Sequence, residues 1–502
     1  MKLRGGRRAA PLRRMWASNS LHFTEVASMD IVPQFALLSA QHPVLAAQLM
    51  EVISLLSRLR AETGGAEAPT MVAAEAQIGE ALDQVYGSAM GSILEAYEPG
   101  EAEVEASGLR YRRMKQKSRG VYFSLRGPVV VMRHLYRQVG VHDGPTIVPL
   151  ELRAGIVGGR WLPQAAVAAA HLLQDEPSRD AAATCRALGV MPYSRSSLSR
   201  AGEEIGNRWE EIRMEAESEV AAAFEIPVEA VALSIGVDRV SLPMSEPVVD
   251  KDGTPVLDKE GRGHAPVVYR MAYCGIATLH DKEGEPLASF RYGRMPEEGH
   301  GPIEESLWGD VEQLKAVRPD LRLLGIADGA PEMQQILERV LQPFETDVHI
   351  AIDFWHVAEK LAAAISATGR LTADLLPGFK RILLEDDLGA EQVSKVLHAW
   401  AGALPEGECP QPLRDAITYL DRNAHRMRYA DLRRHGLPIG SGHVEATCKT
   451  LVSTRMKRSG ARWRNDGGQV VLSLRSLARS SRWEPAMNIV TRSFRQTRAV
   501  AA

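Results

Sequence analysis

Three carboxylates stand where their charges are costly to bury and where they can bind metal ions. Asp238 lies inside an apolar, β-branched run, Asp328 ends a second apolar run, and Glu445 opens a helical segment. A carboxylate within or at the tip of a buried strand is unfavourable unless a partner neutralises its charge. Carboxylate oxygens suit Mg²⁺ or Mn²⁺, and two such ions about 4 Å apart can activate a nucleophile and stabilise a leaving oxygen in phosphodiester chemistry.

Each carboxylate also has a purely structural interpretation. Asp328 precedes Gly329, and the Asp-Gly pair is common in turns. Asp238 could pair with the arginine that follows it, although adjacent residues of a strand point to opposite faces. Glu445 does not fit a capping box, because the residue three positions after Ser441 is apolar. In the order strand, strand, helix, the three residues together favour a metal site over three unrelated acids.

Two further motifs accompany these carboxylates. The segment 352–356, Ile-Asp-Phe-Trp-His, resembles the Asp/Cys-x-x-His signature that Mutator-like and related DDE transposases carry between the second Asp and the Glu. The segments 438–445, Pro-Ile-Gly-Ser-Gly-His-Val-Glu, and 455–463, Arg-Met-Lys-Arg-Ser-Gly-Ala-Arg-Trp, are similar to the terminal block of ISKra-type bacterial insertion-sequence transposases. The resemblance covers roughly residues 105 to 485.

The resemblance implies a DDE transposase with an RNase H-like mixed sheet that is interrupted by an all-helical insertion. Asp238, Asp328 and Glu445 would then be the catalytic residues and the ligands of two Mg²⁺ or Mn²⁺ ions. Asp353 and His356 would be accessory residues behind the metal ligands or in contact with DNA. The expected partners are double-stranded DNA, at the element ends and at the target, and further copies of the chain in a homo-oligomer.

Two alternatives share part of this pattern. A domesticated DNA-binding protein derived from a transposase would keep the basic segments but has no need for the three carboxylates. Another RNase H-like nuclease, such as a junction resolvase, would share the acids. Such a nuclease needs neither a large helical insertion nor an end-binding domain ahead of the core.

A sheet must position the carboxylates. Apolar and alternating patterns predict strands over 232–242, 267–279, 287–292, 321–327 and 348–353, with one helix after the third strand and another over 332–341. This order is typical of an α/β fold with a mixed sheet flanked by helices, here divided between 207–356 and 438–502. The stretch 357–437 is helical in pattern and too long for a loop, which agrees with an inserted subdomain.

The segments before the sheet fall into three parts. Residues 1–28 are expected to be a disordered basic arm, although a transit peptide or a later start at Met15 or Met29 would also explain their composition. Residues 29–104 are expected to form a helical module with helices over 35–59 and 71–97. Residues 105–206 are expected to bind DNA through a β-hairpin over 121–136, which turns at Gly127-Pro128, and a helix-turn-helix within 160–206.

The helix-turn-helix is predicted from a helix cap and a glycine turn. Ser178 can cap the first helix, Gly189 can end it, and residues 194–200 open the second. A recognition helix reads base edges with its N-terminal residues, so the expected contacts are Arg195, Ser196 and Arg200. Many helix pairs that are joined by a glycine turn are simply packed helices.

Basic residues are segregated along the chain, although its net charge is only −3. Residues 106–142 hold nine basic and no acidic side chains, and residues 449–502 hold twelve basic against two acidic ones. Such blocks are typical of contacts with a phosphate backbone, whereas a single charged run is usually a solvated face. The contacts expected in the C-terminal block are Lys449, Arg455, Lys457, Arg458, Arg462, Trp463 and Arg464, and Trp463 is favoured over Trp355 for touching DNA.

Composition is consistent with a globular protein of about three domains, since the 502 residues are 45% hydrophobic and 25% charged. The four cysteines lie far apart and form no Cys-x-x-Cys pair, so neither a zinc ribbon nor a disulfide framework is indicated. The longest apolar stretch is too short to cross a bilayer. A membrane protein is therefore not expected, and the resemblance to bacterial insertion-sequence transposases implies a cytoplasmic, nucleoid-associated protein.

Overall fold

The computed structural model describes residues 31–495, except for 64, 66–68, 253, 255, 257–264 and 345–347. The chain divides into two compact units, and the boundary lies between Ala96 and Tyr97. Each unit is described by itself. The basic arm expected over residues 1–28 lies outside the described residues.

The first unit consists of three helices, α1 (Ile31–Gln41), α2 (Pro43–Glu62) and α3 (Met71–Glu95). The single helix expected over 35–59 is in fact two, because Pro43 has no N–H to donate and therefore starts a new helix. The helix expected over 71–97 is confirmed, and its N-cap is Thr70, whose hydroxyl accepts a hydrogen bond from the Ala73 amide at 3.2 Å.

The second unit begins with a four-stranded antiparallel sheet, made of β1 (Glu103–Ala106), β2 (Leu109–Ser124), β3 (Gly127–Gln138) and β4 (Thr146–Ile147). The expected hairpin is present as β2 and β3, but both strands are longer than predicted. Its turn is at residues 125–126, because Gly127 pairs with Ser124 as the first residue of β3. The sequence placed this turn two residues too late.

Four helices follow: α4 (Pro149–Ala154), α5 (Pro163–Asp175), α6 (Ser178–Leu188) and α7 (Arg195–Ala222). Gly189 ends α6 in a left-handed conformation, with φ 66°, as expected. Ser178 is not a cap, since Pro177 occupies the N-cap position of α6. The cap is instead at α7, where the Ser194 hydroxyl accepts from the Ser197 amide at 3.2 Å. Because α7 has 28 residues, it passes through position 206, where a boundary was expected.

A second sheet carries the three carboxylate motifs. It is mixed, with strand order β7-β6-β5-β8-β9, and comprises β5 (Ala232–Ser245), β6 (Val267–His280), β7 (Pro286–Arg294), β8 (Arg322–Ala327) and β9 (Val348–Ile352). β5, β6 and β7 are antiparallel neighbours, whereas β8 runs parallel to both β5 and β9. All five strands lie close to the predicted ranges, which confirms an α/β fold.

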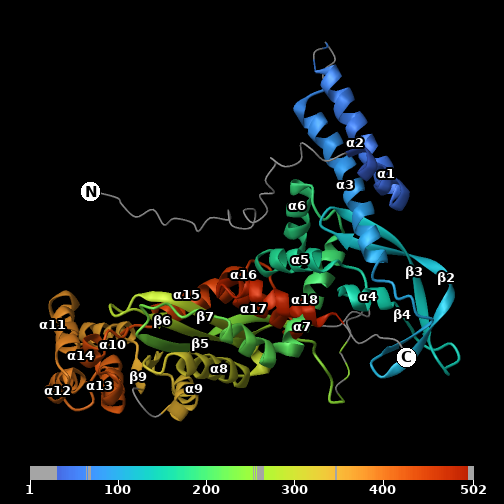
Figure 1. The fold of residues 1–502 in the computed structure, drawn as a ribbon. Helices are drawn as coiled ribbons and strands as arrows, with labels where there is room; N and C mark the ends of the chain where they lie inside the picture. Colours follow the sequence, from blue (N-terminus) through green and yellow to red (C-terminus); the bar gives the residue numbers. More distant parts are fainter. Residues whose placement is uncertain are drawn as a thin grey trace. The chain divides into compact units, whose positions relative to one another are not determined.

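Helices cover both faces of this sheet (Figure 1). One face packs on α8 (Gly301–Val317) and α9 (Pro331–Leu341) through Leu233, Ile235 and Val237 of β5. Alternate residues Val240 and Leu242 face a continuous helical segment, α15 (Gly442–Thr447), the π-helix η6 (Cys448–Ser453) and α16 (Thr454–Met456). Since side chains alternate along a strand, Asp238 shares the face of Val240 and Leu242.

The expected helical insertion lies at one edge of the sheet (Figure 1), and its apolar core includes Leu324 of β8 and Ile352 of β9. Its helices are α10 (Phe354–Ala367), α11 (Thr372–Glu385), α12 (Gly389–Gly402), α13 (Gln411–Asn423) and α14 (Tyr429–Arg434). Short 3₁₀ turns occur at η3 (Pro296–Glu298), η4 (Gln342–Phe344) and η5 (Ala424–Arg426). β9 leads directly into α10, so the insertion starts where the strand ends.

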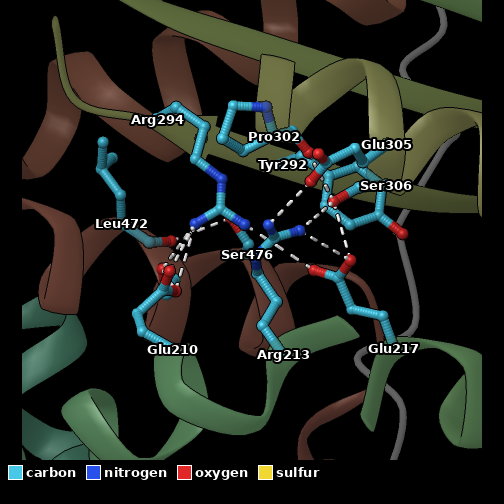
Figure 2. Close-up of polar contacts among 12 residues, drawn as sticks. Glu210, Arg213, Glu217, Tyr292, Arg294, Pro302, Glu305, Ser306, Leu472 and Ser476 are labelled. Carbon is cyan, nitrogen blue, oxygen red and sulfur yellow. Dashed lines mark hydrogen bonds and ion pairs between the residues drawn. The ribbon is translucent and has the colours of Figure 1, made fainter. Parts of the chain in front are cut away.

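The last helices, α17 (Asn465–Arg479) and α18 (Trp483–Ser493), share one hydrophobic core with α5, α6 and α7. The helix-turn-helix region therefore packs on the C-terminal end of the chain. Ion pairs join α7 to the second sheet (Figure 2), since Arg294 of β7 binds Glu210 of α7 at 2.9 Å and lies 3.8 Å from Glu217. Burial raises the pKa of Glu217, which also accepts from the Ser306 hydroxyl at 2.7 Å. Glu210 and Glu217 are therefore half-buried structural contacts.

Candidate active site and nucleic-acid surface

Asp238 is the central carboxylate of the candidate site. It lies seven residues into β5, and its Oδ1 accepts a hydrogen bond from the Arg239 amide at 2.6 Å. Burial raises the pKa of Asp238, and the nearby Asp328 carboxylate raises it further. The structure therefore brings together the two aspartates that 90 residues of sequence separate.

Asp328 follows the last residue of β8 and is exposed. Its Oδ1 accepts from the Ala330 amide at 2.9 Å, and Gly329 adopts a left-handed φ of 91°, so the turn considered from the sequence is real. The turn does not exclude a role for Asp328 in the site. Because β8 runs parallel to β5, Asp328 lies beside Asp238. Asp328 is thus both a turn residue and a neighbour of Asp238.

The helix that carries Glu445 lies directly on β5. Val444 sits over Gly236, where an added Cβ would come within 2.1 Å of its Cγ2. One turn further on, the Cys448 thiol donates to Asp238 Oδ2 at 3.6 Å. Glu445 is exposed and lies one helical turn before Cys448, on the helical segment that bonds to Asp238.

The three carboxylates do not form a compact single-ion site. Asp238, Asp328 and Glu445 are not a set whose ligand oxygens all lie within 4.8 Å of one another.

Asp353 positions the site and is not available as a metal ligand. It is 6% exposed and caps α10, with Oδ1 accepting from the amides of Trp355 at 2.6 Å and His356 at 2.9 Å. Its Oδ2 accepts from the amide of Ser441 at 2.5 Å and also from the Ser441 hydroxyl. Oδ1 therefore fixes the start of α10, and Oδ2 fixes the residue that precedes the Glu445 helix.

His356 contacts Tyr419, a residue that the sequence did not indicate, and Tyr419 in turn contacts Asp328. Its ring meets Tyr419 of α13 edge-on, with centroids 6.3 Å apart, and the Tyr419 hydroxyl donates to the backbone oxygen of Asp328 at 2.7 Å. Burial raises the pKa of Tyr419, as do the charges of Asp328 and Asp353. Tyr419 lies 91 residues from Asp328 in a plain helical pattern, so no local signal marks it.

Other polar residues under the Glu445 helix were also missed. The Ser234 hydroxyl lies 2.7 Å from His280 Nε2 and 3.4 Å from His443 Nε2. Burial lowers the pKa of both histidines, that of His443 to about 4, so both are neutral at pH 7. His280 Nδ1 lies 3.0 Å from the Gly284 carbonyl oxygen and must donate to it, which leaves Nε2 to accept from Ser234. This group anchors the helix and has no free nucleophile.

Cys448 has a thiol whose state depends on its neighbours. A hydrogen bond with Cys274 raises the pKa of Cys448, as do burial and the Asp238 charge. It therefore remains a thiol that donates to Asp238. All four cysteines are free, as the sequence indicated.

The residues expected to read DNA lie at the start of α7. Arg195, Ser196 and Arg200 are all exposed on its first two turns. Arg200 Nε donates to the Ser196 backbone oxygen at 3.2 Å, which holds its side chain along the helix. The connection from α6 to α7 has six residues, longer than the usual three or four of a DNA-binding helix pair.

One predicted phosphate contact of the C-terminal block is wrong. Arg455 is 8% exposed, donates to the Glu176 backbone oxygen at 3.2 Å, and covers the Trp463 ring at 5.0 Å. Burial lowers its pKa to about 10, and two neighbouring arginines add to the effect. Arg455 therefore joins the helical segment to the end of α5 and does not face solvent. The exposed members of the block are Lys449, Lys457, Arg458, Arg462 and Arg464.

Trp463 is likewise a structural residue. Its indole N–H donates to the Met456 backbone oxygen at 2.9 Å, and its own amide donates to Pro243 O at 3.0 Å. Trp463 is half-buried, and its contact with DNA stays a prediction. Trp355 is 56% exposed beside Asp353, with Lys380 Nζ 4.8 Å from its ring centre, so it is the better stacking surface.

The chain matches no protein-family model and no curated protein sequence. Within the part of the chain that the structure describes, no helix is both long and apolar enough to cross a membrane. The assignment of function therefore depends on the geometry above and on the motifs of the sequence.

Proposed function

We propose that this protein is a DDE transposase, which cleaves DNA at the ends of a mobile element and joins those ends to target DNA. The observation that carries the proposal is the convergence of three elements on the inner strands of the second sheet, near the carboxyl end of β8. Asp238 and Asp328 meet on parallel strands, and the helix of Glu445 lies on the same face, bonded to Asp238 through Cys448.

The topology supports an RNase H-like interpretation. Three antiparallel strands are followed by a helix, a parallel strand, a second helix and another parallel strand, and helices cover both faces of the resulting sheet. The helical insertion begins after β9 and ends just before the segment that carries Glu445. This is the position that the resemblance to DDE transposases implies for it.

Divalent ions such as Mg²⁺ would activate the attacking oxygen and stabilise the leaving oxygen of a phosphodiester. The protein's part is to hold the ligands in place. Asp238, Asp328 and Glu445 are the residues that would hold these ions. Asp353 fixes Ser441, and Val444 packs on Gly236, so the Glu445 helix cannot slide along β5. The partial burial of Asp238 and the repulsion between its charge and that of the exposed Asp328 favour cation binding.

DNA would be bound by two exposed groups of side chains. Arg195, Ser196 and Arg200 at the start of α7 are placed to read bases, whereas Lys449, Lys457 and Arg458 follow Glu445 and would hold phosphates. A homo-oligomer is supported by the first unit, where apolar side chains of α2 stay exposed at spacings of three residues: Met50, Ile53 and Leu56.

The test compares Asp238→Asn, Asp328→Asn and Glu445→Gln with the wild type in a Mg²⁺-dependent assay on DNA that carries the sequences flanking the reading frame. Each amide keeps the shape of the side chain but removes the charge that the ions need. Cleavage should fall by more than about 100-fold, since loss of mere outer partners of metal ligands already costs about 10- to 100-fold.

The control is Asp374→Asn, which changes an exposed carboxylate of the insertion in the same way and should leave cleavage intact. DNA binding in EDTA should survive in all four variants. A wild-type cleavage rate for Asp238→Asn would refute the proposal, because Asp238 is the residue that both Asp328 and the Glu445 helical segment approach.

A further inference from the structure

We propose that His349, Asp431 and His435 form a site for a zinc-class transition-metal ion, separate from the three carboxylates. One ligand atom from each of these residues lies within 4.8 Å of the others, a set that no other three His, Cys, Asp or Glu residues in the described ranges provide. This inference does not depend on the proposed DNA chemistry.

The site lies at the end of the sheet opposite to the carboxylates. His349 is the second residue of β9, whereas Asp353 follows the last one, and four residues of strand span about 13 Å. Arg322, the first residue of the parallel strand β8, donates to the backbone oxygen of His435 at 2.9 Å. An ion at this position would therefore have no contact with Asp238 or Asp328.

Two of the ligands are arranged by α14. Asp431 lies on this helix and His435 follows its last residue, so a spacing of four brings both side chains to one side. His435 Nδ1 lies 3.4 Å from Asp431 Oδ1, yet it is buried and makes no hydrogen bond. A buried nitrogen in this state calls for a partner, and a metal ion held jointly with the carboxylate would supply one.

The surrounding charges leave room for a cation. Arg434 lies 3.2 Å from Asp431 Oδ1 but also pairs with Asp387 at 2.7 Å, so it can turn away toward the second acid. The guanidinium of Arg322 is directed to a carbonyl oxygen and not to the carboxylate. The side chains of His435 and Asp431 are 40% and 33% exposed, which gives an ion access from solvent.

The donor set selects the class of metal. Two imidazole nitrogens with one carboxylate oxygen suit Zn²⁺, Co²⁺ or Ni²⁺, whereas Mg²⁺ prefers oxygen ligands alone. His349 belongs to the sheet, and Asp431 and His435 belong to the helical insertion. The ion would therefore tie the insertion to the edge strand of the sheet, and its expected effect is on stability.

The experiment uses the full chain without a histidine tag, freed of metal with EDTA and then dialysed. Co²⁺ is added first, because its visible absorption reports nitrogen and oxygen ligation directly, and Zn²⁺ is then added to displace it. Wild type is compared with His349→Ala, Asp431→Asn and the control His398→Ala. His398 also pairs with an aspartate, Asp421 at 2.9 Å, but belongs to no set of three ligands.

Wild type and His398→Ala should show one nitrogen-ligated Co²⁺ that Zn²⁺ displaces, and Zn²⁺ at 100 times the dissociation constant of this site should raise the apparent folding constant about 100-fold. His349→Ala and Asp431→Asn should lose both effects while melting in EDTA at the temperature of metal-free wild type. A melting temperature well below that of metal-free wild type would show that the substitution itself damages the fold. The test then depends on Co²⁺ binding by the other of the two variants. Equal Co²⁺ spectra in wild type and His349→Ala would overturn the proposal, as would an absence of Co²⁺ binding to wild type.

Discussion

The contact between β5 and the Glu445 helix gives a direct test of how the site is held. Gly236 has no side chain, and Val444 occupies the vacated space. In Gly236→Ala the new Cβ would lie 2.1 Å from Val444 Cγ2, about 1.3 Å short of an ordinary contact of 3.4 Å. Val444 is buried and stiff at χ1, so the helix must move away from the strand.

This displacement predicts a loss of activity that exceeds the loss of stability. Overpacking of this kind costs about 1–3 kcal/mol, which a chain of this size tolerates. A shift of roughly 1 Å at Glu445 can lower a reaction rate by about 100-fold when the catalytic geometry depends on it. We therefore expect a folded protein whose Mg²⁺-dependent DNA cleavage falls about 100-fold.

The matched control is Gly275→Ala, on the neighbouring strand β6. Its Cβ would lie 2.8 Å from Ile303 Cγ2 of α8, so it also overpacks the sheet, but on the face away from Glu445. Cleavage by both variants is compared at a temperature where circular dichroism shows each to be folded. Gly275→Ala should lose stability and keep most of its cleavage rate.

A second substitution separates displacement from general damage. Val444→Ala removes the methyl group that clashes, and the other neighbours of the new Cβ lie at 3.4 Å, an ordinary contact. The double variant Gly236→Ala/Val444→Ala should therefore cleave faster than Gly236→Ala alone, a coupling expected only for residues in contact. Equal cleavage by the two glycine variants, or no rescue by Val444→Ala, would refute the reasoning.

Two further predictions concern charge. Replacing Lys457 and Arg458 by alanine should lower the log–log salt slope of DNA binding by about 1.8, at about 0.9 per phosphate contact. Adding Arg455→Met should reduce stability without a further change in this slope. DNA-binding titrations at several salt concentrations test both expectations, and a drop of about 2.7 in the triple variant would show that Arg455 does contact phosphate. Folding raises the pKa of Asp238, so its ionisation lowers the free energy of unfolding once the pH rises above the ordinary carboxyl range near 4. This decrease in stability is complete when the pH exceeds the raised pKa. Asp238→Asn should thus have a higher melting temperature than wild type at pH 7 in EDTA. This difference in melting temperature should disappear on acidification below about pH 4, and Mg²⁺ should not stabilise the variant. A lower melting temperature of the variant at pH 7 would contradict this.

The sequence by itself was sufficient for the sheet and for the order of its elements. The five strands of the second sheet and α9 lie near their predicted bounds, since apolar alternation reports directly which residues are buried. The same local patterns placed Asp238 within a strand, Asp328 at the end of one, and Glu445 at the start of a helix. Local turn chemistry was less secure, because Gly127 and Pro128 open β3 and do not form its turn.

Only the tertiary structure decided which polar residues serve the site and which serve the fold. Arg455 and Trp463 read as DNA contacts in a basic segment, but each is bonded within the protein, Arg455 to α5 and Trp463 to the end of β5. Tyr419 and Cys448 carry no local signal, yet they touch Asp328 and Asp238 across 91 and 210 residues. A periodic pattern shows that a face is covered, whereas the identity of the covering residue depends on how distant segments pack together.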